Sequence, residues 1–205
     1  VKTPHSTSAS EFYYNFNPTT LQLPDGSWAL ITRTVAQQAN PATAGNPDFL
    51  TLAKIELKPH TGTQENCRSG DNLRVSVASP INSSSIVLRS TPGATFDDKG
   101  LQDPRVMQDP ATGVYYLTFT SLGSNFTGTG IATSKDGTTW TKVGRCDVDH
   151  TRPFSKGYDG HCGYGRAASM LYRDEGEHYM IWGAGTLNLA RSVNRSLLHW
   201  ETVQG

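Results

Sequence analysis

The stretches Gly113-Val-Tyr-Tyr-Leu-Thr-Phe-Thr-Ser121 and Gly130-Ile-Ala-Thr-Ser-Lys-Asp-Gly-Thr-Thr-Trp140 decide the fold of this chain. In the first stretch apolar residues alternate with polar ones, which is the pattern of a half-buried β-strand. The second stretch is another strand that ends in Ser134, passes through a polar turn and closes on an aromatic residue. Together the two stretches predict a small antiparallel sheet.

The same unit is found at two other places in the chain. One copy consists of Gly176-Glu-His-Tyr-Met-Ile-Trp182, Leu187-Asn-Leu-Ala-Arg-Ser192 and Leu198-His-Trp200. The other consists of Asp25-Gly-Ser-Trp-Ala-Leu-Ile-Thr-Arg33 and, after an insertion, Ile86-Val-Leu-Arg-Ser90 and Gly93-Ala-Thr-Phe96. Repetition of one small antiparallel sheet is how a β-propeller is built. We therefore predict an all-β fold of the propeller type with about three blades.

The repeats also predict how the chain is divided. We expect a flexible N-terminal tail at residues 1–11 and a partial propeller domain at 12–205. Its blades are expected at about 12–98, 99–144 and 165–205, and the alternating stretch 49–57 within the first blade predicts an additional strand. Because a propeller usually needs at least four blades to close, we expect the rest of the polypeptide or another chain to supply the missing ones.

Composition supports short strands and excludes some partners. The chain has 205 residues, of which 36% are hydrophobic and 18% are charged, with 20 Gly and 11 Pro. Its 18 basic residues balance 18 acidic ones, so there is no positive field to attract nucleic acid. No apolar run approaches the roughly 18 residues that a membrane-spanning helix needs. We expect neither nucleic-acid binding nor membrane insertion.

Cysteines and glycosylation sequons indicate the cellular compartment. Cys146 and Cys162 bracket a Gly-rich loop and could form a disulfide, worth about 3 kcal/mol in the chain-entropy model. Cys67 would then be left over, and the alternative is that all three are reduced thiols. Acceptor sequons begin at Asn82, Asn125 and Asn194, which fall in expected loops or turns. We expect an extracellular or secretory-pathway glycoprotein.

The segment Gly100-Leu-Gln-Asp-Pro-Arg-Val106 could carry chemistry, because it precedes the strand of the second unit, where blades approach the axis. In an extended segment residues i and i+2 face the same side, so Asp103 and Arg105 should point together with Gln102 turned away. Pro104 should hold Asp103 extended. A carboxylate beside a guanidinium suits a polyhydroxylated ligand, and the alternative is a structural ion pair in an Asp-Pro turn.

These residues resemble glycoside hydrolase family 130, whose members are five-bladed propellers that cleave β-mannosides by hydrolysis or phosphorolysis. The resemblance covers most of the chain from residue 15 onward. In the second blade it rests on Asp103-Pro-Arg-Val106, Tyr115-Tyr-Leu-Thr-Phe-Thr120 and Ile131-Ala-Thr-Ser-Lys-Asp-Gly137. In the first and third blades it rests on Phe16-Asn-Pro18, Trp28-Ala-Leu-Ile-Thr-Arg33, Ala168-Ser-Met170, His178-Tyr-Met180, Leu189-Ala-Arg-Ser192 and His199-Trp200.

The resemblance implies roles for particular residues. Asp103 would be the general acid that protonates the departing sugar oxygen, with inversion at the anomeric centre. Sugar-binding roles fall to Asn17, Arg33 and Arg105. Phosphorolysis would use inorganic phosphate as co-substrate, with Arg152, Lys156 and Arg166 as candidate ligands. No other cofactor and no metal is expected, and the partner would be an oligosaccharide or glycan.

Two alternatives remain open. The family usually has Glu before the Asp-Pro-Arg segment, where this chain has Gln102. This departure favours a second hypothesis, a non-catalytic extracellular glycoprotein that binds glycans or assembles with other chains. An arabinanase- or invertase-like propeller would need Asp near the start of the first blade, where this chain has Asn15 and Asn17.

Overall fold

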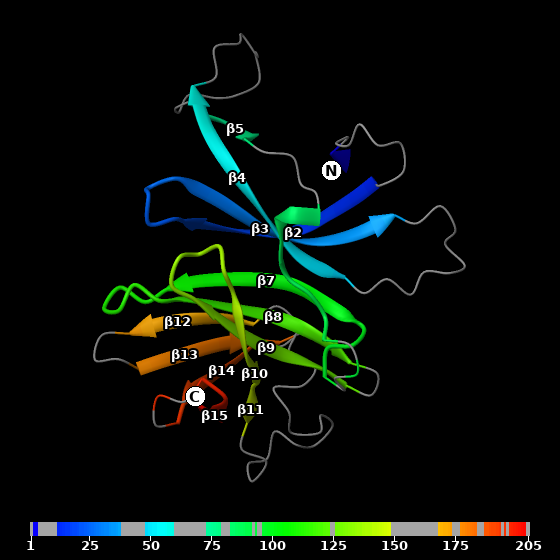
Figure 1. Cartoon of the computed structure of the whole chain (residues 1–205). Coiled ribbons are helices and arrows are strands. Elements are labelled where there is room, and N and C mark those ends of the chain that lie inside the picture. The colour runs from blue at the N-terminus through cyan, green and yellow to red at the C-terminus, as the bar shows by residue number, and fades with distance from the viewer. Residues whose placement is uncertain are drawn as a thin grey trace.

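The computed structural model describes residues 2–3, 12–37, 48–59, 73–78, 83–91, 93, 96–123, 126–148, 168–173, 177–183, 187–193, 195 and 197–203. In this part of the chain nearly all regular structure is β-strand, arranged in three sheets (Figure 1). The short exception is the 3-10 turn η2 (Ser83–Ser85). None of the helical structure described there has the length and apolar character needed to cross a membrane.

The first sheet contains six strands in the order β1-β2-β3-β4-β5, with β6 also paired to β4. The strands are β1 (Lys2–Thr3), β2 (Phe12–Gln22), β3 (Trp28–Gln37), β4 (Phe49–Pro59), β5 (Leu73–Val77) and β6 (Ile86–Leu88). The additional strand predicted at 49–57 is confirmed as β4. Lys2 and Thr3, predicted to lie in a flexible tail, instead pair with the edge strand β2, whose backbone groups would otherwise lack partners.

The second and third sheets repeat one pattern, in which consecutive strands are neighbours. The second sheet has the order β10-β9-β8-β7, from β7 (Gly100–Gln108), β8 (Tyr115–Gly123), β9 (Phe126–Ser134) and β10 (Thr141–Arg145). The third has the order β11-β15-β14-β13-β12, from β11 (Asp147–Val148), β12 (Ser169–Arg173), β13 (Glu177–Trp182), β14 (Asn188–Ser192) and β15 (His199–Thr202). β11 departs from this pattern, since it lies beside β15 and runs parallel to it.

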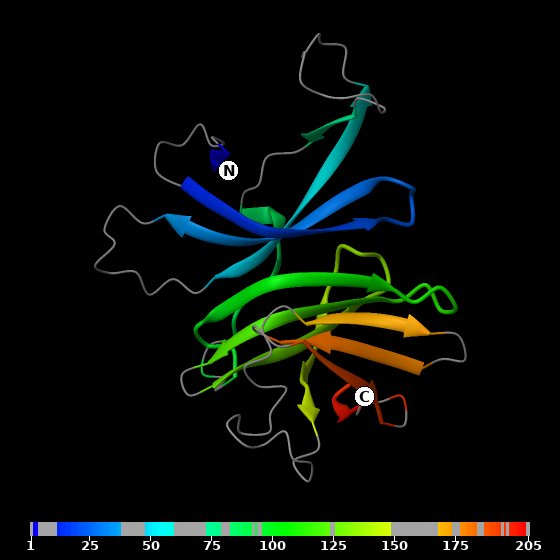
Figure 2. The ribbon, with the colours of Figure 1, turned by 180° about the vertical axis from the view of Figure 1, so that it is seen from behind.

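The sheets pack face to face, with the second sheet between the other two (Figure 1; Figure 2 shows the same order from behind). One core cluster joins the first and second sheets through residues such as Ile31 and Leu117. Another joins the second and third through residues such as Ile131 and Met180. Strand β7 of the second sheet contacts both neighbouring sheets, through β2 of the first sheet and β12 of the third. The predicted propeller-type arrangement is confirmed.

The turns of the second and third sheets use the same device. The indole of Trp140 donates to the carbonyl of Gly137 at 3.0 Å, and that of Trp200 donates to the carbonyl of Leu197 at 2.9 Å. Both rings are buried. A ring that fills the core and satisfies its N–H in the preceding turn fixes where each last strand begins.

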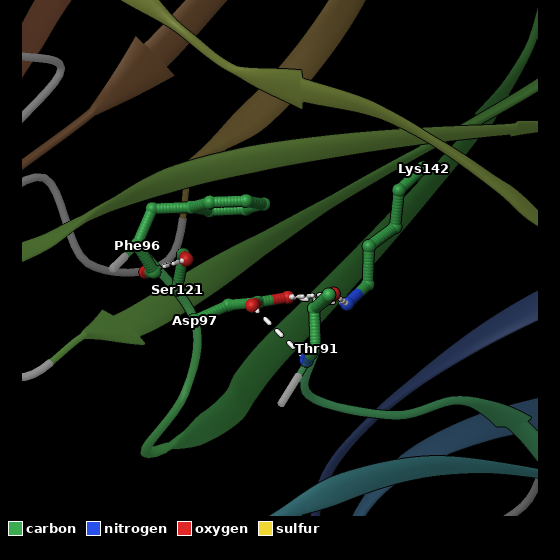
Figure 3. Close-up of polar contacts among 5 residues, drawn as sticks. All are labelled: Thr91, Phe96, Asp97, Ser121 and Lys142. Atoms are coloured by element: carbon green, nitrogen blue, oxygen red, sulfur yellow. Dashed lines mark hydrogen bonds and ion pairs between the residues drawn. The ribbon is translucent and has the colours of Figure 1, made fainter. Parts of the chain in front are cut away.

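A buried ion pair anchors the connection from the first sheet to the second (Figure 3). Asp97, fully buried in the turn before β7, pairs with Lys142 of β10. It also accepts hydrogen bonds from the backbone N–H of Thr91 at 3.1 Å and from the Thr91 hydroxyl at 3.3 Å. Beside it, Ser121 donates to the carbonyl of Phe96. The connection is thereby held against both an inner and the outermost strand of the second sheet.

The predicted disulfide is not formed, because Cys146 is a free, fully buried thiol. It packs in the core between the second and third sheets near Trp200, with its Sγ 4.0 Å from the carbonyl oxygen of Leu197. Sequence spacing sets the length of a loop but not the direction of a sulfur, and here the sulfur acts as a small apolar group. The proposed partner Cys162 and the third cysteine, Cys67, lie outside the described residues.

A buried histidine lies between the second and third sheets. His178 on β13 stands between two tyrosine rings, with centroids 5.2 Å from Tyr116 and 5.8 Å from Tyr172. Neither ring nitrogen has a hydrogen-bond partner among the described residues. Burial lowers the pKa of His178, the Arg195 charge lowers it further, and the Asp109 charge opposes both. The folded protein therefore favours the neutral ring.

This burial predicts a pH-dependent stability. In the unfolded chain His178 takes up a proton near pH 6.5, whereas in the folded chain it does so only at a lower pH. The free energy of unfolding is therefore unaffected by this group above about pH 6.5 and decreases as the pH falls from there towards the folded-state pKa. We expect the urea midpoint to fall between pH 7 and pH 5, and to fall less in His178→Phe, which keeps an aromatic ring. The exposed His199→Phe is the control. An equal fall in His178→Phe and wild type would contradict the prediction.

Candidate active site

Two β-bulges mark the candidate site, one in each of the adjacent strands β2 and β7. The register of β2 against β3 shifts between Phe16 and Thr19, and that of β7 against β8 shifts between Gln102 and Arg105. Each bulge contains a residue–proline pair whose first member has a left-handed backbone. Bulges re-aim side chains, and strained backbone of this kind concentrates at functional sites.

The two left-handed residues bond to each other. Asn17 has φ 47° and Asp103 has φ 49°. The side-chain amide of Asn17 donates to Oδ1 of Asp103, which joins positions 86 residues apart in the sequence. Asn and Asp adopt this left-handed backbone more readily than other non-glycine residues, so the residue types at positions 17 and 103 suit the backbone conformation found there.

The prediction of an extended Asp103 held by Pro104 is wrong, because the residue forms a bulge. A bulge breaks the two-residue alternation on which the prediction depended. The guanidinium of Arg105 donates to the carbonyl of Pro104 at 2.7 Å, and within the described chain no ion pair joins it to Asp103. Gln102 is not simply turned away, since its side chain reaches across to the first sheet.

A second group of polar side chains lies beside these bulges. Arg33 of β3 forms an ion pair with Asp48 at 2.8 Å. Its guanidinium also lies over the ring of Phe16, 5.4 Å from the centroid. The amide of Gln102 donates to the same carboxylate oxygen of Asp48 at 2.5 Å. Asp48 was missed by sequence reasoning, because it lies in the insertion of the first blade and an acidic residue before a strand carries no specific signal.

The structure brings together some of the sequence candidates and leaves others undescribed. The two bulges contain Asn17 and Asp103, and Arg105 ends the second bulge. Arg33 lies on the neighbouring strand β3, where it pairs with Phe16 at the start of the first bulge. The candidate phosphate ligands Arg152, Lys156 and Arg166 lie outside the described residues, as do Asn82, Asn125 and Asn194.

The side chains of the site offer the hydrogen-bond donors and acceptors that suit a neutral, polyhydroxylated ligand. Its carboxylates accept hydrogen bonds, its guanidiniums donate them, and the Asn and Gln amides do both. The exposed ring of Phe16 offers an apolar surface next to Asn17. In the described parts of the chain no three His, Cys, Asp or Glu side chains are grouped as a metal would require.

The chain matches no protein-family model and no curated protein sequence. It does resemble solved structures. One is a glycoside hydrolase family 130 protein from work on hydrolases that target β-1,2-mannosidic linkages in Candida mannan (20% identity, TM-score 0.59, 96% of this chain, 50% of that one). Another is a glycosyl hydrolase from Bacteroides ovatus (18% identity, TM-score 0.61, 96% and 50%).

A β-1,2-mannobiose phosphorylase from Listeria innocua is similar over 98% of this chain and 62% of its own length, with 11% identity and a TM-score of 0.57. The chain thus spans between half and two thirds of the length of these structures. At these identities the likeness shows a shared fold, that of propeller-type glycosidases and phosphorylases.

Proposed function

We propose that this chain is part of a carbohydrate-active enzyme that cleaves β-mannosidic or related glycosidic bonds with inversion, with Asp103 as general acid. The observation that carries the proposal is the Asn17–Asp103 hydrogen bond between two strained bulges. The shared fold with glycosidases and phosphorylases supports it. The test is turnover of β-1,2-mannobiose by wild type and by Asp103→Asn.

In the proposed mechanism the Asp103 carboxyl gives its proton to the glycosidic oxygen as the bond to the anomeric carbon breaks. Water, or inorganic phosphate as co-substrate, attacks the opposite face and leaves an inverted product. Asn17, Arg33 and Arg105 bind sugar hydroxyls. In phosphorolysis Arg152, Lys156 and Arg166 would bind the phosphate.

A second candidate function is a non-catalytic glycan-binding glycoprotein of the secretory pathway. It is favoured by Gln102 where the resembled family has Glu, and by the sequons at Asn82, Asn125 and Asn194. Sugars at these positions would appear in the intact mass of the natural protein before and after enzymatic deglycosylation. Glycan binding without any turnover would support this second function.

We also propose that a further sheet of the same kind covers the outer face of the third sheet. The second sheet packs on the third through Met107, Tyr116 and Ile131. By cross-strand register, the residues of the third sheet equivalent to these three are Leu171, Tyr179 and Leu189, which lie on its outer face. On this face Leu171 and Ile181 are exposed in the chain. An apolar face of repeated composition suits another sheet, from the rest of the polypeptide or from another chain.

Leu171→Asp tests this assembly. If a sheet covers the face, we expect the natural protein to lose about 3 kcal/mol of stability or to dissociate, because a charge would be buried without a partner. The exposed substitution Val143→Asp, on the edge strand β10, is the control. Sedimentation of the 205-residue chain then tests one source, because a dimer that Leu171→Asp disrupts indicates that a second copy of this chain covers the face. Unchanged stability and assembly would refute the proposal.

A further inference from the structure

One carboxylate links the first and second sheets beside the proposed site. Asp48 directly precedes β4 and bridges Gly100 at the start of β7. Its carbonyl accepts a hydrogen bond from the N–H of Leu101 at 3.0 Å. Gly100 has φ 138°, and a Cβ at this position would lie 2.7 Å from the Asp48 nitrogen. Close backbone contact therefore determines where Asp48 lies.

The side chain of Asp48 gathers donors from both sheets. Its Oδ2 accepts from Gln102 Nε2 at 2.5 Å and lies 2.8 Å from Arg33 Nη2. The exposed fractions of the Asp48 and Arg33 side chains are 12% and 26%, so solvent screens the group only in part. Charge-assisted hydrogen bonds in such a setting are about twice as strong as neutral ones.

This contact explains why residue 102 is Gln. A carboxylate oxygen can only accept, so its neighbour must donate, and the Gln102 amide does so. A glutamate in place of Gln102 would put a second carboxylate against Asp48, where each would oppose ionisation of the other. Gln102 is therefore the hydrogen-bond donor that the Asp48 carboxylate requires at this position.

The two residues that Asp48 holds adjoin the two bulges. Gln102 directly precedes Asp103. Arg33 pairs across the sheet with Phe16, which directly precedes Asn17, and covers its ring. We propose that Asp48 is a positioning residue: through Gln102 and Arg33 it aligns the bulges so that Asn17 can bond to Asp103. The significance of this alignment for catalysis rests on the proposed function.

The experiment compares Gln102→Glu, Asp48→Asn and the double variant in the natural protein. In the double variant the amide introduced at position 48 can donate to the carboxylate introduced at position 102, which can pair with Arg33. The contact is thereby restored with its charges exchanged. We expect Gln102→Glu to lower the urea midpoint and the double variant to recover most of the loss. Gln108→Glu makes the same change at an exposed position of the same strand and is the control. Additive effects of the two single variants would refute the contact.

Positioning is measured at Asn17 itself. Its side-chain NH₂ signals in ¹⁵N–¹H spectra report the bond to Asp103. We expect these signals to shift in both single variants, to return in the double variant and to stay in place in Gln108→Glu. Altered stability with unmoved Asn17 signals would mean that Asp48 is merely structural, and would overturn the inference.

Turnover separates this inference from the proposed function. With β-1,2-mannobiose, with and without inorganic phosphate, we expect kcat to fall about 10- to 100-fold in Gln102→Glu, with a smaller change in KM, as for a misaligned reacting group. If wild type is inactive while the Asn17 signals respond as expected, the proposed function fails and the positioning role stands. If wild type is active and both kcat and the Asn17 signals are unchanged in Gln102→Glu, the positioning role fails and the proposed function stands.

Discussion

Asp103→Asn is expected to abolish turnover of β-1,2-mannobiose, with a loss of about 10²- to 10⁴-fold in kcat. Asparagine keeps the size of the side chain and its ability to bond to Asn17, but it has no acidic proton to give to the departing oxygen. The measurement is release of mannose, or of mannose 1-phosphate when inorganic phosphate is present. An aryl mannoside whose leaving group needs no protonation should be cleaved by the variant with much less loss.

Asp25→Asn is the matched control for this prediction. Asp25 is an exposed carboxylate in the β2–β3 turn, where hydrogen bonds from Ser27 lower its pKa to about 2. It lies apart from the bulges, so its replacement should leave kcat unchanged. Unchanged turnover in Asp103→Asn would eliminate the acid role. Equal losses for both substrates would show that the variant fails for a reason other than proton donation.

Lys142→Met is expected to destabilise the protein by about 3 kcal/mol, because it leaves the buried carboxylate of Asp97 without its counter-ion. Asp97 is fully buried, and its other hydrogen-bond partner among the described residues is Thr91, which cannot neutralise the charge. For a chain of this size such a loss lowers Tm by roughly 6–12 °C. The measurement is thermal unfolding followed by circular dichroism, with urea unfolding for the free energy.

The chain offers a control pair for this measurement. Lys54 and Asp25 form an ion pair of 3.3 Å between side chains that are about half exposed. Lys54→Met should cost no more than about 1 kcal/mol, since solvent screens the pair. The double variant Asp97→Asn, Lys142→Met should recover part of the loss, because no buried charge remains. Similar losses for Lys54→Met and Lys142→Met would contradict the anchoring role of Asp97.

The repeated units allowed the sheets to be predicted because strand alternation and turn chemistry are local properties. Trp140 and Trp200 close equivalent turns of the repeated unit, and the structure places both rings in the core. The strand at 49–57 was predicted from its alternation for the same reason. The direction of the Cys146 sulfur depends on packing between sheets, and a spacing argument could not provide it.

The candidate site could be predicted only in part. Asp103 was singled out by its Asp-Pro-Arg segment and Asn17 by the family resemblance, and the structure brings the two residues into contact. Their left-handed backbone was not foreseen, since a residue before proline is normally extended. Asp48 was missed because its importance comes from Gly100 and Gln102, which are distant in sequence and meet it only when two sheets pack.

By itself the sequence determined the kind of sheet, its repetition and the turns that end it, because these depend on neighbours along one strand or hairpin. The tertiary structure alone decided how one sheet lies against the next. It thereby selected the bulges at Asn17 and Asp103, the carboxylate that joins Arg33 to Gln102 and the burial of Asp97 with Lys142. These contacts form between sheets, and their energies depend on burial and on the distance between charges. Neither quantity can be read from the order of residues along one strand or hairpin.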